Sequence, residues 1–116
     1  MRAAFFDLTI EQGATFRQVF RWQDKSKQPF DLTGFTAKLM MRQSVASPNT
    51  LKTLTTENGG IQLGGQTGSI TLYISPADTS ALRWDSAVYD LALYAPGGDV
   101  YRLVEGQVNV KPAVTR

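Results

Sequence analysis

The stretch "GGIQLGGQTGSITLYIS", residues 59–75, decides the fold class of this chain. From Gly60 it differs from the phosphate-binding loop G-x-x-x-x-G-K-[ST] at Gln66, where that loop carries lysine. A phosphate loop must also lead into a helix, whose N-terminal amides and dipole hold the phosphate. Residues 69–75 instead alternate apolar and polar side chains, many of them β-branched, which predicts a strand. We therefore expect strands at 61–63 and 69–75 with a glycine-rich turn between them, and no nucleotide site.

The same period of two recurs along the chain. Apolar and polar residues alternate over residues 4–11, 16–22 and 35–42, so each stretch reads as a strand with one face on a core. Glycine and proline punctuate these runs, and "APGGDV" (95–100) predicts a hairpin between two strong strands. The stretch 43–58 is weaker and predicts a loop followed by a short edge strand near 51–55.

One helical turn and one irregular strand complete the pattern. Ser75 is a suitable N-cap, Pro76 stands at the first helical position, and Asp78 is placed to close a capping box. This predicts one or two turns near residues 76–82. In the last strand the apolar parity changes, which predicts a β-bulge near Leu103–Gly106. With roughly seven to nine short strands, the chain is expected to be all-β, an antiparallel β-sandwich forming a single domain over residues 1–116.

The composition excludes several function classes. The chain has no histidine and no cysteine, so it lacks the usual general base and the thiolate metal ligands. We expect no catalytic, cofactor-binding or metal-binding residues, and not an enzyme. Twelve basic and ten acidic residues give a net charge of +2, which is too small to indicate a nucleic-acid partner. No apolar run approaches about 20 residues, and no signal peptide is recognisable, so we expect synthesis in the cytoplasm and no membrane partner.

Basic residues mark the candidate binding surface. Two predicted strands each carry two basic side chains on their outward face, with one apolar side chain between them. If both strands belong to one sheet, they form a basic stripe. That stripe is either a solvated face whose charges discourage edge pairing or a protein–protein interface. Its residues are Arg17, Val19, Arg21, Lys38, Met40 and Arg42. The loops 24–28 and 43–58 are expected to add contacts.

The stretch "WDSAVYDL" (84–91) resembles the D-S-A-x-Y-x-C motif of immunoglobulin-like sandwiches, with Leu91 at the cysteine position. The resemblance implies that the fold is immunoglobulin-like and that Tyr89 is its corner tyrosine, bonded to the backbone of the preceding corner. It also implies that an apolar pair replaces the disulfide, with Phe20 or Trp22 facing Leu91.

Longer stretches resemble a group of small tailed-bacteriophage and prophage virion proteins. They are "DLTGF" (31–35), "GSITLYISPADTSAL" (68–82), "YDLALYAPGGDVYRLVEGQVNV" (89–110) and the terminal "VTR". The D-L-T-G turn before a strand, and the passage from the helix to "YDL" (89–91), are also similar to the N-terminal domain of phage baseplate upper proteins. The resemblance implies a non-enzymatic structural component of the tail, baseplate or neck and collar. Such a protein is made in the bacterial cytoplasm, built into the virion in several copies, and contacts other virion proteins.

Two alternatives stay open. A sandwich module that binds carbohydrate or the host surface would use Trp22, Trp84 and the tyrosines as a sugar-stacking platform, although large aromatics in alternating strands are usually core residues. A small phage-encoded inhibitor of a host protein would leave no trace in the sequence.

Overall fold

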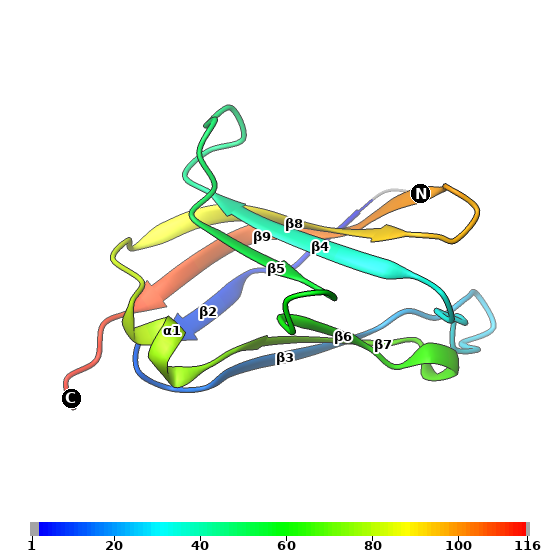
Figure 1. Ribbon diagram of the computed structural model, residues 1–116, viewed down its shortest axis with the longest axis horizontal. Helices are drawn as coiled ribbons and strands as arrows, with labels where there is room; N and C mark the ends of the chain where they lie inside the picture. The colour runs from blue at the N-terminus through cyan, green and yellow to red at the C-terminus, as the bar shows by residue number, and fades with distance from the viewer. Residues whose placement is uncertain (1–2, 116) are drawn as a thin grey trace.

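The chain folds as two β-sheets packed face to face, in a computed structural model that describes residues 3–115 (Figure 1). One sheet has six strands in the order β1-β9-β8-β4-β5, with β2 also paired to β9, and the other has the order β3-β7-β6. The strands are β1 (Ala4–Phe5), β2 (Leu8–Glu11), β3 (Phe16–Arg21), β4 (Thr36–Arg42), β5 (Lys52–Thr55), β6 (Ile61–Leu63), β7 (Ser69–Ile74), β8 (Ser86–Tyr94) and β9 (Val100–Lys111). A 3-10 turn, η1 (Gly65–Thr67), and a helix, α1 (Pro76–Ser80), complete the elements.

This strand order is that of an immunoglobulin-like sandwich, so the expected fold class is confirmed. The sandwich is not antiparallel throughout, because β1 and β2 run parallel to β9. The turn after β2 contains Gly13, which adopts φ +87°. This turn carries the chain from one sheet to the other, so β2 and β3 do not close a hairpin (Figure 1).

The core lies between the sheets and is filled by alternate residues of nearly every strand. Leu39 and Leu91 are fully buried in the six-stranded sheet, facing Ile70 and Leu72 of the three-stranded sheet across one continuous cluster. The period-two segments are thus strands with one buried face, as predicted. The first segment differs, because Phe6 and Asp7 interrupt it and separate β1 from β2.

The predicted bulge lies in β9. Leu91 pairs with Val104 and Ala92 with Arg102, so Leu103 is the extra residue. Both Leu103 and Val104 are buried as a result. The bulge therefore turns two consecutive apolar side chains toward the core, as the change of parity required.

Helix α1 begins as predicted, with Ser75 Oγ accepting a hydrogen bond from Asp78 N at 3.2 Å. The helix is shorter than expected and ends at Ser80. The Asp78 carboxylate lies 3.8 Å from Lys52 Nζ of β5, so the acidic residue pairs across to a strand and does not complete a capping box. None of the helices among residues 3–115 is long and apolar enough to span a membrane.

The glycine-rich stretch forms β6, η1 and β7. A strand therefore follows the glycines, where a phosphate-binding loop would lead into an α-helix. Gly68 has φ +70°, and a Cβ at this position would lie 2.5 Å from Trp22 O. Glycine is required here because the turn packs directly against the backbone that leaves β3.

Candidate protein-interaction surfaces

The predicted basic stripe does not exist as one surface. β3 belongs to the three-stranded sheet and β4 to the six-stranded sheet, so their outward faces lie on opposite sides of the sandwich. The prediction assumed that consecutive strands share a sheet, but the chain crosses between the sheets after β3. The structure therefore places Arg17, Val19 and Arg21 on one side, and Lys38, Met40 and Arg42 on the other.

On β3, the three outward residues alternate along the exposed face of the smaller sheet. The Arg17 guanidinium lies 5.2 Å from the centroid of the Tyr73 ring, which belongs to its cross-strand neighbour on β7. Val19 stands between the two arginines with 43% of its surface exposed.

On β4, the outward residues contribute to structure as well as surface. Arg42 Nη1 donates to the carbonyls of Ser47 and Pro48, both at 3.1 Å, and Arg42 Nη2 lies 3.4 Å from Met40 Sδ. These bonds fasten the loop 43–51, which rises above the outer face of the six-stranded sheet (Figure 1). Arg42 therefore stabilises part of one of the two predicted contact loops. Lys38 is exposed.

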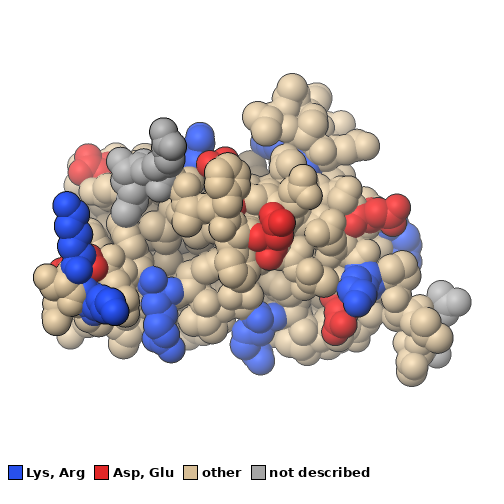
Figure 2. Space-filling view, turned by 180° about the vertical axis from the view of Figure 1, so that it is seen from behind, with Lys and Arg blue, Asp and Glu red and all other residues tan. Residues whose placement is uncertain are grey.

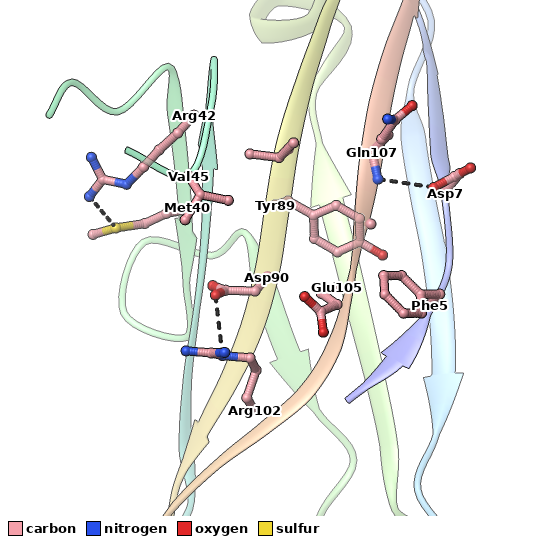
Figure 3. Close-up of a pocket in the computed structure, with 12 residues that line it drawn as sticks. Phe5, Asp7, Met40, Arg42, Val45, Tyr89, Asp90, Arg102, Glu105 and Gln107 are labelled. Carbon is pink, nitrogen blue, oxygen red and sulfur yellow. Dashed lines mark hydrogen bonds and ion pairs between the residues drawn. The ribbon is translucent and has the colours of Figure 1, made fainter. Parts of the chain in front are cut away.

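A groove of about 590 Å³ runs across this outer face, between that loop and β1 (Figure 3). Phe5 forms one rim and Val45 the other, and their exposed fractions are 81% and 89%. The floor comes from β4, β8 and β9. Its lining residues are Phe5, Asp7, Met40, Arg42, Val45, Val88, Tyr89, Asp90, Arg102, Glu105, Gly106 and Gln107.

Charges of both signs lie in the groove. Arg102 Nε is 3.4 Å from Asp90 Oδ2, a pair that is largely exposed and so contributes little to stability. Asp7 Oδ1 accepts a hydrogen bond from Gln107 N at 3.0 Å, which ties the β1–β2 segment to β9. Glu105 forms no ion pair within the described part of the chain. An approaching partner thus meets apolar rims and the Glu105 carboxylate, which has neither an ion pair nor a side-chain hydrogen bond within residues 3–115.

Of the residues that line this groove, sequence reasoning named Met40, Arg42 and Tyr89, and its predicted contact loop 43–58 contains Val45. Phe5 was missed, and Val45 was not singled out within its loop, because their positions depend on long-range geometry. The parallel pairing of Phe5 with Glu105 brings β1 beside the floor, and the Arg42 bonds hold the loop that carries Val45. The available signal was the phenylalanine pair in "AAFFDL" (3–8), where one ring must point away from the core if the stretch is a strand.

Tyr89 lies beneath the groove and is buried. Its hydroxyl donates to Phe6 O, in the break between β1 and β2, and not to the corner just before β8. The prediction that this hydroxyl bonds to the corner before β8 is therefore wrong. The backbone between β1 and β2 comes closer to the hydroxyl than that corner does. Burial raises the pKa of Tyr89, and the negative charge of Asp7 raises it further.

The two tryptophans do not form a common platform. Trp22 is only 6% exposed and stacks on Phe30 with ring centroids 4.0 Å apart. Its ring also meets Tyr101, near the hairpin that joins β8 to β9, whereas Trp84 precedes the opposite end of β8. Within residues 3–115 no group of three or more acidic residues is arranged to hold a metal ion.

Comparison with known proteins adds little beyond this geometry. No protein-family model matches the chain, and no curated protein matches it. Among solved structures, the chain is similar to an endo-fucoidan hydrolase of glycoside hydrolase family 107, with 14% identity and a TM-score of 0.49. The alignment covers 97% of this chain and 13% of that chain, so it spans a small part of the hydrolase. No activity follows for this chain from so distant a likeness.

Proposed function

We propose that this chain is a non-enzymatic structural component of a tailed-phage or prophage particle, in the tail, baseplate or neck and collar. It acts through protein–protein contacts in a multimeric assembly, in which the groove over β4, β8 and β9 receives an apolar side chain of a neighbouring virion protein. The motifs that resemble virion proteins support the assignment to a particle. The single observation that supports contact through the groove is the pair of exposed apolar side chains, Phe5 and Val45, on its two rims.

Exposed apolar side chains are common singly, but their convergence on one concave face is typical of a binding surface. Large apolar side chains at the centre and charged groups around them are also the usual composition of protein interfaces. The groove contains both kinds of group, because Met40 and Val88 lie on its floor beside the Arg102–Asp90 pair, between the two apolar rims. Its partner would combine an apolar anchor with a basic group for Glu105.

Quantitative mass spectrometry of purified particles, induced from the strain that encodes the chain, tests this function. We expect the protein at a fixed copy number relative to the tail-tube protein. Absence from the particles, despite abundance in the producing cells, would contradict the proposal and would favour an assembly helper or a host-directed binder.

A further inference from the structure

Strand β3 ends the smaller sheet and has one unpaired edge among residues 3–115, since β7 is the only strand paired with it in that range. Trp22 N donates to Gly68 O at 2.9 Å, just beyond the β3–β7 ladder. Residues of an antiparallel strand alternate in the side to which their backbone groups point. The backbone N–H and C=O groups of Gln18 and Phe20 therefore point toward β7. Those of Arg17, Val19 and Arg21 point toward the open edge.

A side-chain bond supports this orientation. Gln18 Nε2 donates to Val19 O at 3.2 Å, so that carbonyl points away from β7 and is within reach of a side chain. Beyond the ladder with β7, no hydrogen bond within residues 3–115 uses the N–H groups of Arg17, Val19 or Arg21.

The β5 edge of the other sheet is closed, in contrast. On β5, Asn58 Oδ1 accepts from Thr55 N at 2.9 Å, and Asn58 Nδ2 donates to Thr53 O at 3.0 Å. One side-chain amide thus takes the place of the next strand. No comparable cap covers the outward N–H groups of β3 among the hydrogen bonds of residues 3–115, so these donors are available to an added strand.

The outward side chains at this edge are basic. Arg17 and Arg21 flank Val19, and neither makes an ion pair in the described part of the chain. Basic side chains line the lower side of the molecule, where the three-stranded sheet lies, with most acidic ones above them (Figure 2). A strand placed beside β3 would set its own side chains about 5 Å from these residues. Acidic residues fit opposite the two arginines.

The inward side of the same edge is apolar. Phe6, which is 43% exposed, meets Phe20 of β3 edge-on, with ring centroids 5.3 Å apart. The Tyr89 hydroxyl holds the backbone of Phe6 in place. An added strand would direct every second side chain toward this aromatic pair, where an apolar residue is favoured.

We propose that the open edge of β3 binds an extended strand of a partner protein by β-augmentation. The strand carries acidic side chains opposite Arg17 and Arg21 and apolar side chains packed against Phe6 and Phe20. A second copy of this chain fits poorly, because self-pairing centred on Val19 places Arg17 of each copy opposite Arg21 of the other. This surface lies on the sheet opposite the groove, so either site can fail without the other.

The capped peptide TEIVIET is the probe, because its two glutamates align with the two arginines and its isoleucines point inward. Amide hydrogen exchange followed by NMR on the whole chain should show fast exchange at Arg17, Val19 and Arg21 before addition. Saturating peptide should slow exchange at these amides by about tenfold or more, since each gains an acceptor. The control peptides are TKIVIKT and a TEIVIET methylated on the central valine nitrogen, and neither should bind. Protection in the free protein, equal binding of the controls, or no binding at millimolar peptide would overturn the proposal.

Three variants test the contact. Val19→Pro removes an N–H at the open edge but none from the β7 ladder, so the fold should persist while peptide affinity falls about tenfold or more. Val19→Thr keeps the N–H and should bind as the parent does. The double variant Arg17→Glu/Arg21→Glu tests the charge rule even if the proline variant fails to fold. It should prefer TKIVIKT, and continued preference for TEIVIET would overturn the assigned partner chemistry.

Discussion

The Tyr89 hydroxyl connects β8 to the first strands through its bond to Phe6 O. Tyr89→Phe removes the donor and leaves a part-buried carbonyl without its partner, so we expect the free energy of unfolding to fall by about 1–2 kcal/mol. Urea denaturation measures this loss. Tyr94→Phe is the control, because the Tyr94 hydroxyl makes no hydrogen bond within residues 3–115, and its change should stay below about 0.5 kcal/mol. Equal effects of the two variants would contradict the role of Tyr89.

The same hydroxyl should make the free energy of unfolding depend on pH in the alkaline range. Its pKa is raised in the folded protein by burial and by the charge of Asp7, whereas the unfolded chain titrates near 10.0. The folded state therefore holds the hydroxyl proton more tightly than the unfolded chain does. The contribution of this group to the free energy of unfolding is intact below the pKa of the unfolded chain and is lost as the pH rises above it. Unfolding free energies measured between roughly pH 8 and pH 11 should fall more steeply for the parent than for Tyr89→Phe. Parallel curves would show that Tyr89 does not titrate in this way.

Helix α1 is joined to the turn between β2 and β3 by one buried side chain. Thr79 is fully buried, and its hydroxyl donates to Ala14 O at 2.9 Å and accepts from Gly13 N at 3.0 Å. Thr79→Val keeps the shape but leaves both backbone groups unpaired, which should cost about 1–3 kcal/mol of unfolding free energy. Thr79→Ser keeps the hydroxyl and should lose less in the same denaturation experiment. If valine is tolerated as well as serine, the helix is not held by this link.

Local sequence pattern predicted the elements well, because strand period, helix capping and the bulge in β9 each depend on residues close together in the chain. The β1–β2 break was not predicted, since its cause is distant. A Cβ at Gly106 would collide with Phe6 O, so glycine at this point of β9 lets the first segment approach and bend. The Thr79 link and the Tyr89 bond were missed or misassigned for the same reason, because each joins residues more than 60 positions apart.

Across the whole sandwich, the largest difference from the predicted site is that residues 17–21 and residues 38–42 lie on different sheets. Alternation identified the outward residues of both strands correctly, but it carries no information on which sheet a strand joins. The structure replaces one expected stripe with two separate surfaces, a groove on the larger sheet and an open edge on the smaller one. Two surfaces on opposite sides are what a protein needs to contact different neighbours in a ring or collar.

The groove is tested most directly by a competition for incorporation into particles. A double variant, Phe5→Ser/Val45→Ser, removes both apolar rims at positions so exposed that folding should be unaffected. Val114→Ser is the matched control, because Val114 is 95% exposed and lies outside the groove. Each is produced together with the parent chain, and mass spectrometry compares the ratio of variant to parent in purified particles with that in the cells. We predict that the double variant is depleted about tenfold or more from particles while the control keeps its cellular ratio. Incorporation of the double variant at its cellular ratio would contradict assembly through this groove.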